Sequence, residues 1–117
     1  HRHSSAASDV YKRQTPTKLV FFETPSNPLL ELVDIAAVSK LAHEAGARVF
    51  VDKVFATALK QRPLENGADI VIYFATKHID GQGRLIGAAV LGSRKFIDDV
   101  LLPFYLQTGA AMSAFNA

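Results

Sequence analysis

Four short apolar runs, separated by turns and by one clear helical pattern, most constrain how this chain can fold. The runs cover residues 18–23, 48–51, 69–74 and 85–91. The first run is almost continuously apolar and is closed by prolines, which predicts a strand that is buried on both faces. Strands that alternate with helices indicate an α/β sheet, and the short connection before the fourth run allows an antiparallel neighbour.

Two helices are predicted along with these strands. Asp34 can cap a helix that Gly46 ends, and Ser93 can cap a second helix that ends near Pro103. We expect the first helix to have an apolar and a polar face. The apolar face would consist of Ile35, Val38, Leu41, Ala42 and Ala45, and the polar face of Ser39, Lys40, His43 and Glu44. Residues 56–66, which include a proline, predict a loop with a short helical turn.

Residues 1–14 differ from the rest of the chain. They show neither helical nor strand periodicity and resemble a translated cloning adapter, so we exclude them and expect one domain over residues 15–117. This segment holds three cations and one acid, and without it the net charge falls from +2 to 0. We therefore expect no nucleic-acid partner. No apolar run is long enough to span a bilayer, so we expect a soluble protein with no membrane partner. Separately, we expect it to be located in the cytoplasm.

Several kinds of site are excluded by residue type and spacing. The chain has no cysteine, so neither a disulfide nor a thiolate zinc site can form. No pair among the four histidines has metal-ligand spacing, and we expect no metal site. Neither a Gly-x-Ser-x-Gly elbow nor a Walker-type phosphate loop occurs. Gly81, Gly83 and Gly87 precede a strand and lack the spacing of a dinucleotide-binding loop.

An acid and an amine stand beyond the ends of two apolar runs. Asp52 closes the run 48–51, and Lys77 follows the run 69–74. Ligands of open α/β sheets bind beyond the carboxyl ends of the strands, so both side chains could face one pocket. Such a pair suits pyridoxal phosphate (PLP), because an amine can form an imine with the cofactor aldehyde and a carboxylate can keep the ring nitrogen protonated.

Four motifs occur in a characteristic order around these two residues. They are Glu-Thr-Pro-Ser-Asn-Pro at 23–28, Val-Asp followed by Phe-Ala-Thr at 51–57, Ala-Thr-Lys at 75–77, and Ile-Asp-Gly-Gln-Gly-Arg at 79–84. Together they resemble the cystathionine γ-synthase family of PLP enzymes of cysteine and methionine metabolism, and the last motif resembles its O-succinylhomoserine sulfhydrylases in particular. The resemblance runs from about residue 18 to the end. It implies part of the large, PLP-binding domain of a fold-type-I transferase, an aspartate-aminotransferase-like three-layer α/β/α fold.

The resemblance implies roles for four residues, all toward pyridoxal 5'-phosphate. Lys77 would be the catalytic lysine, which binds the cofactor as a Schiff base and then moves protons between substrate carbons. Asp52 would pair with the ring nitrogen, Asn27 would hydrogen-bond the phenolic oxygen, and Thr76 would donate its hydroxyl to the phosphate. Each residue also has a purely structural alternative. Lys77 could be a solvated surface lysine and Asp52 a strand-end or capping carboxylate. Asn27 could be a turn residue held extended by Pro28, and Thr76 could supply a turn hydroxyl.

The implied reaction is γ-replacement on an activated homoserine. O-succinylhomoserine or O-acetylhomoserine would react with sulfide to give homocysteine for methionine biosynthesis, in a homotetramer built of dimers. The same framework serves cystathionine γ-synthases and carbon–sulfur lyases. These activities stay open, as does a chain without catalytic function.

Some positions depart from the family pattern. Lys53 stands where the family usually has asparagine, and it could compete for Asp52 or disturb nearby packing. Phe74 stands where the family has serine, which would place a ring in the phosphate cup. Other departures are Ala88, Ala110 and Ala114. Groups that the family takes from flanking segments are also missing, so we expect an internal fragment of a longer enzyme that is inactive alone.

Overall fold

The computed structural model describes residues 16–115 and 117, so the segment 1–14 set apart above lies outside the described residues. The strands are β1 (Leu19–Glu23), β2 (Arg48–Asp52), β3 (Ile70–Tyr73) and β4 (Ala89–Gly92). The helical elements are α2 (Ile35–Glu44), the 3-10 helix η1 (Leu64–Asn66), α3 (Arg94–Phe96), the π-helical segment η2 (Ile97–Leu101) and α4 (Leu102–Thr108).

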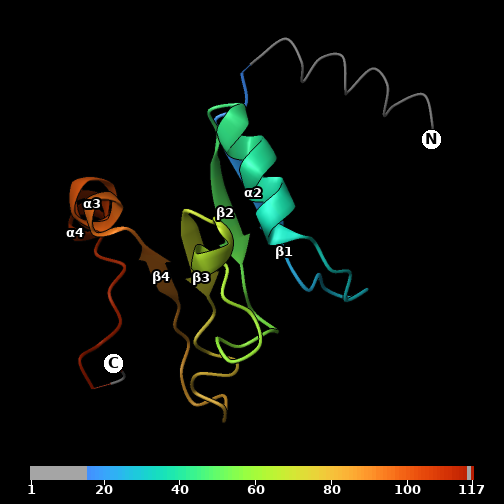
Figure 1. Ribbon diagram of the computed structural model, residues 1–117. Helices are drawn as coiled ribbons and strands as arrows, with labels where there is room; N and C mark the ends of the chain where they lie inside the picture. Colours follow the sequence, from blue (N-terminus) through green and yellow to red (C-terminus); the bar gives the residue numbers. More distant parts are fainter. Residues whose placement is uncertain (1–15, 116) are drawn as a thin grey trace, which may run out of the picture.

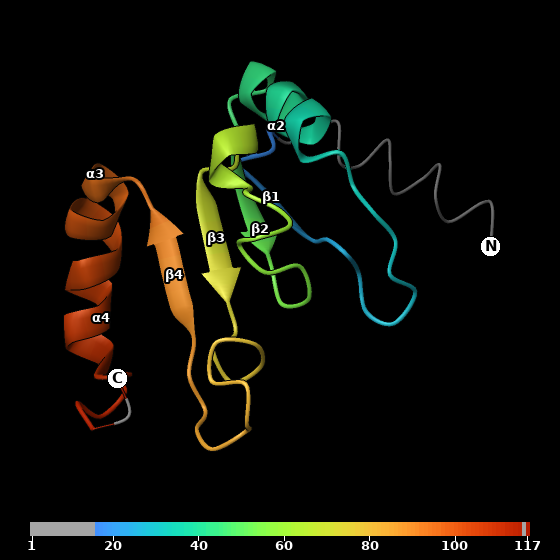
Figure 2. The ribbon, with the colours of Figure 1, turned by 60° about the horizontal axis from the view of Figure 1, so that its bottom comes forward.

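The four strands form one sheet in the order β1-β2-β3-β4. The first three strands are parallel, with Phe22 opposite Val51 and Val51 opposite Val71, whereas β4 runs antiparallel to β3. The expected α/β sheet and its antiparallel neighbour are therefore confirmed. Because β1, β2 and β3 point the same way, the loops that follow them leave from one edge of the sheet (Figures 1 and 2).

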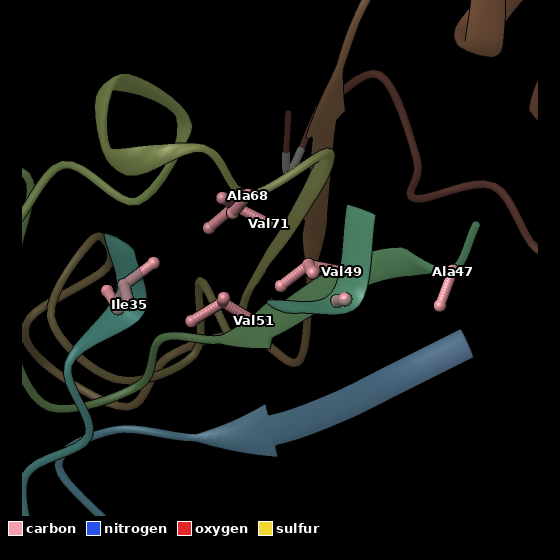
Figure 3. Close-up of a cluster of buried hydrophobic side chains, with 7 residues drawn as sticks. Ile35, Ala47, Val49, Val51, Ala68 and Val71 are labelled. Atoms are coloured by element: carbon pink, nitrogen blue, oxygen red, sulfur yellow. The ribbon is translucent and has the colours of Figure 1, made fainter. Parts of the chain in front are cut away.

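The core lies between α2 and one face of the two central strands. Side chains alternate between the faces of a strand, so Val49 and Val51 share a face and both are fully buried. The buried apolar cluster consists of Ile35, Ala42, Ala47, Val49, Val51, Ala68 and Val71 (Figure 3). Each fully buried valine contributes about 1.5–3 kcal/mol relative to an exposed one. This contact fixes the position of α2 on the sheet.

Strand β1 corrects one expectation. Its sequence predicts burial on both faces, but Leu19 is 48% and Phe21 is 56% exposed. Val20 and Phe22, which point to the other face, pack against the core cluster. Among the described residues β1 pairs only with β2. It is therefore an edge strand that is covered on one face.

Helix α2 begins as predicted. The Asp34 side chain accepts a hydrogen bond from the backbone N–H of Ala37 at 3.0 Å, and Gly46 follows the helix with φ +75°. The predicted faces are partly wrong, because Leu41 and Ala45 are exposed and Ser39 is buried. Gly67, with φ +93°, approaches so closely that a Cβ there would lie 3.0 Å from the Cβ of Ser39. A small residue on the helix allows that approach, which the helical periodicity alone does not reveal.

The C-terminal helix corrects a second expectation. The Ser93 hydroxyl accepts from the backbone N–H of Phe96 at 3.1 Å, as predicted for a cap, but the helical stretch continues past Pro103 to Thr108. The N–H of Leu102 bonds the carbonyl of Ile97, so the turn before Pro103 is a π turn. Pro103 then lies directly after this π turn, in the first turn of α4, so the proline falls where the hydrogen-bond pattern of the helix changes.

The fourth strand is shorter than the sequence predicts. Residues 85–88 are not part of β4, which begins at Ala89. The backbone N–H and C=O of Gly87 bond to Thr76. The backbone groups of Gly87 therefore bond to the loop after β3 and not to a neighbouring strand.

One carboxylate joins α2 to the start of the central strands. Asp69 Oδ2 lies 2.9 Å from His43 Nε2 and accepts from the backbone N–H of Val49 at 2.7 Å. Burial opposes ionisation of Asp69, but these two hydrogen bonds and the nearby Arg48 outweigh it and lower its pKa. The ionised Asp69 carboxylate therefore stabilises the fold above the pKa of an aspartate in the unfolded chain. This contribution is lost as the pH falls through the lowered pKa of Asp69 in the folded chain.

We predict that Asp69→Asn lowers the free energy of unfolding by about 1 kcal/mol at neutral pH, a modest value because the side chain is 36% exposed. The difference from the unsubstituted chain should begin to shrink below about pH 4, where Asp69 of the unfolded chain becomes protonated, and should vanish below the lowered pKa of Asp69 in the folded chain. Urea unfolding at both pH values measures it. Asp98→Asn, which removes an exposed pair with Arg94, is the matched control and should cost less. Equal costs at neutral pH would contradict the prediction.

Candidate functional site

Three loops gather at the carboxyl edge of the parallel strands (Figure 2). They cover residues 24–34, 53–63 and 74–88, which follow β1, β2 and β3. The register places Glu23, the last residue of β1, opposite Asp52, the last residue of β2. The site residues predicted from the sequence all lie on this edge or in these loops.

Asp52 carries an unsatisfied oxygen. Its Oδ1 is buried and has no hydrogen-bond partner among the described residues. Burial raises the pKa of Asp52, and the negative charge of Glu23 raises it further. A buried acceptor without a donor costs about 1–3 kcal/mol. The arrangement is therefore suited to a ligand that brings an N–H donor to this oxygen.

Glu23 is a site residue that was not singled out from the sequence. Its Oε2 accepts from the backbone N–H of Asn27 at 3.1 Å, which ties the loop after β1 to the strand end. The Asn27 side chain is exposed and makes no hydrogen bond with the described residues, so its amide is available. The signal for Glu23 was present, since it closes one apolar run as Asp52 closes another.

Lys77 lies in a tight turn after β3. Its backbone N–H donates to Phe74 O at 3.0 Å, and its carbonyl accepts from Gly81 N at 2.9 Å. Its side chain is exposed, and in the described part of the chain its amine has neither a hydrogen-bond nor an ion-pair partner. The backbone is thus held while the amine stays free.

The hydroxyl of Thr76 is already engaged. It donates to Gly87 O at 3.1 Å and accepts from Gly87 N at 2.9 Å. A hydroxyl has one proton, so in this arrangement none is left to donate to a ligand. The phosphate role implied for Thr76 stays a prediction and requires this hydrogen bond to be exchanged.

Asp80 organises the glycine loop, and sequence reasoning missed this role. Its Oδ2 accepts from the backbone N–H groups of Arg84 at 2.8 Å and Gln82 at 3.3 Å. The Arg84 bond contributes most to the lowered pKa of Asp80. Gly81 and Gly83 both have positive φ, at +72° and +67°. An aspartate followed by alternating glycines was the available signal for such a turn.

Two of the departures from the family pattern, Lys53 and Phe74, have different surroundings. The Lys53 amine does not pair with Asp52, because it donates to the Tyr73 hydroxyl at 3.3 Å. Phe74 is 45% exposed and lines a mainly apolar cavity of about 490 Å³. Other residues lining this cavity are Val54, Thr57, Leu59, Tyr73, His78 and Ile79. The cavity lies beside the turn that carries Lys77.

The described residues contain neither a membrane-spanning helix nor a cluster of metal-binding side chains. No helix in the described part is long and apolar enough to cross a membrane. Residues 16–115 and 117 also contain no cluster of three or more His, Cys, Asp or Glu side chains that could hold a metal ion.

Comparison with known proteins gives a consistent picture. The Cys/Met metabolism PLP-dependent enzyme family model matches residues 3–117. The chain is 60% identical over 102 residues to O-succinylhomoserine sulfhydrylase of Mycobacterium tuberculosis, covering 87% of this chain and 25% of the relative. It is 52% identical over 101 residues to the O-succinylhomoserine sulfhydrylase of Pseudomonas aeruginosa, covering 86% of this chain and again 25% of the relative. The chain thus spans about a quarter of the length of these relatives.

The fold is likewise similar to a solved structure. The crystal structure of an apo methionine gamma lyase from Micromonospora echinospora superimposes with a TM-score of 0.81 at 41% identity, covering 84% of this chain and 27% of that one. This likeness and the mixed α/β sheet confirm the fold predicted from the sequence, part of a fold-type-I large domain.

We predict that Asp52→Asn raises the free energy of unfolding of the ligand-free chain by about 1 kcal/mol at neutral pH, because it removes a buried, repelled charge. The pKa of Asp52 is raised in the fold, so its ionised form destabilises the fold, and the gain should disappear below the pKa of an unfolded aspartate. Denaturant unfolding across this pH range measures the effect. Glu23→Gln, which removes only the repulsion, should give a smaller gain in the same direction. A loss of stability in Asp52→Asn at neutral pH would refute this reading.

Proposed function

Because the chain belongs to the Cys/Met metabolism PLP-dependent enzyme family, we propose that it supplies the cofactor-holding part of an O-succinylhomoserine or O-acetylhomoserine sulfhydrylase. The reaction is replacement of the γ-acyl group by sulfide to give homocysteine. The observation that carries the cofactor assignment is the buried Asp52 Oδ1 without a donor, at the sheet edge where the loop with Lys77 also lies. The sulfhydrylase assignment is supported by the 60% and 52% identity to two sulfhydrylases.

The residues at this edge fit the cofactor in chemical type. Asp52 offers the missing acceptor for a protonated ring nitrogen, and its negative charge would hold the proton there. The free amide of Asn27 would hydrogen-bond the ring oxygen. Thr76 would contribute to phosphate binding after releasing Gly87. When bound, PLP supplies an electron sink for negative charge that develops on the substrate.

Lys77 has the properties that its two tasks require. Its exposed, unpartnered amine can attach the cofactor covalently and, once released, can remove a proton from one substrate carbon and deliver it to another. The turn fixed by Phe74 and Gly81 limits the backbone motion of the residue while its long side chain moves. A rigid anchor with a mobile amine suits proton transfer between neighbouring carbons.

Two other activities have a specific observation in their favour. A γ-lyase is supported by the 41% identity to a methionine gamma lyase, since the same framework can release sulfur instead of adding it. A chain without catalytic function is supported by the hydroxyl of Thr76, which is committed to Gly87.

We predict that PLP, added to the chain and reduced with borohydride, modifies Lys77 at near-stoichiometric level, as peptide mapping would record. Asp52→Ala should lower labelling at Lys77 several-fold, because the ring nitrogen loses its partner. Lys60→Ala, which removes another exposed lysine, serves as the control and should leave the Lys77 adduct unchanged. Labelling scattered over surface lysines would support the non-catalytic alternative.

The choice of reaction needs a protein that carries this segment within a full-length chain. Incubated with O-succinylhomoserine and sulfide, it should form homocysteine, and Lys77→Ala should abolish the product. Formation of cystathionine when cysteine replaces sulfide at higher kcat/KM would overturn the sulfhydrylase assignment. Release of methanethiol from methionine would instead support a γ-lyase.

A further inference from the structure

Lys53 is the most unusual buried residue in the described part of the chain. It is 1% exposed and is the largest of the fully buried side chains. It follows β2 directly and lies two residues beyond Val51, so alternation directs it to the same face as the core valines. Its amine contacts Tyr73, at 3.3 Å from the hydroxyl and 5.4 Å from the ring centre. Lysine is almost never buried to this extent without an acidic partner.

No such partner is present among the described residues. Lys53 forms no ion pair there, and the charge that acts on it most is the like charge of Arg62. Burial, and then Arg62, lower the pKa of Lys53. The neutral amine is the nucleophilic form of lysine, and burial without a counter-ion favours it.

Lys53 does not itself line a cavity among the described residues, but two of its neighbours do. A cavity of about 230 Å³ is lined by Tyr73, the hydrogen-bond partner of Lys53, and by Arg62, its charged neighbour. Ala58, Val71 and Leu91 provide apolar lining, and Glu65, the ion-pair partner of Arg62, also lines the cavity. A small uncharged electrophile can enter such a cavity without losing hydration of a charge.

We propose that Lys53 is a site of reversible carbamylation by carbon dioxide. The amine lone pair attacks the carbon of CO₂ and forms an N–C bond, one C=O π bond becomes the carboxylate, and the nitrogen loses one proton to solvent. The product is a carbamate anion. No oxidant or further reactant is required.

The surroundings suit the product better than the protonated lysine. The carbamate would carry negative charge near the Arg62 guanidinium, which already pairs with Glu65 at 3.3 Å and would attract a second anion where it now repels a cation. The Tyr73 hydroxyl, which now accepts from the amine, would donate to a carbamate oxygen. Modification therefore replaces a buried cation that Arg62 repels by an anion that Arg62 attracts.

The test uses the complete 117-residue chain with ¹³C-labelled bicarbonate in mildly alkaline buffer. We expect a carbamate carbon resonance in ¹³C NMR that disappears in both Lys53→Met and Lys53→Asn. Arg62→Gln should lower its intensity about threefold, the effect of one partly exposed charge. Lys60→Ala, which removes an exposed lysine, should leave the resonance unchanged.

Chemical trapping makes the test independent of any substitution. A trialkyloxonium reagent converts a carbamate to a stable ester, and peptide mapping of the unsubstituted chain should locate that ester at Lys53. Amide spectra of each variant establish that it is folded. An ester only at the terminal amine and surface lysines, or a resonance of equal intensity in folded Lys53→Met, would overturn the proposal.

Discussion

The in-register parallel pairing of β1, β2 and β3 is the constraint on which the rest of the structure depends. It is held by the valines of the central strands, which pack against α2 and exclude water from one face of the sheet. A shift of one residue in β2 or β3 would turn the valines of that strand to the opposite face. A shift of β2 would also separate Glu23 from Asp52, and a shift of β3 would move both relative to the turn that carries Lys77. The packing of the core and the geometry of the candidate site are therefore set by the same register.

Limited access of water at the carboxyl edge of the parallel strands shifts the pKa of the carboxylate there. Asp52 has a raised pKa because it is partly buried beside another acid, whereas Asp69, at the opposite end of the parallel strands, has a lowered pKa because it receives two hydrogen bonds. The two side chains are chemically identical, but the ionised form of Asp52 lowers the free energy of unfolding, whereas the ionised form of Asp69 raises it. The edge with the unsatisfied carboxylate is the one expected to bind a ligand, since a site prepared for a partner is destabilised without it.

Much of the architecture could be predicted from local patterns. Apolar runs located the strands, and the caps Asp34 and Ser93 located the starts of two helices. What could not be predicted depends on contacts between distant residues. The burial of Ser39 results from the approach of Gly67, and the late start of β4 coincides with hydrogen bonds between Gly87 and Thr76. In the site, Asp52 and Lys77 were found by their strand-end positions, whereas the pairing of Glu23 with Asp52 required the strand register.

The π turn at η2 has a consequence for the helix that follows it. A π turn adds one residue to the helix and so rotates everything downstream by about 100° relative to a continuous α-helix. Phe96, before this turn, contacts Phe50 on the sheet with ring centres 6.2 Å apart, whereas Phe104 and Leu106, after it, are 66% and 71% exposed. The helical stretch therefore uses an aromatic side chain against the sheet before the π turn and leaves large apolar side chains exposed after it. Its first part is oriented by contact with the sheet, whereas its second part leaves apolar surface in contact with solvent.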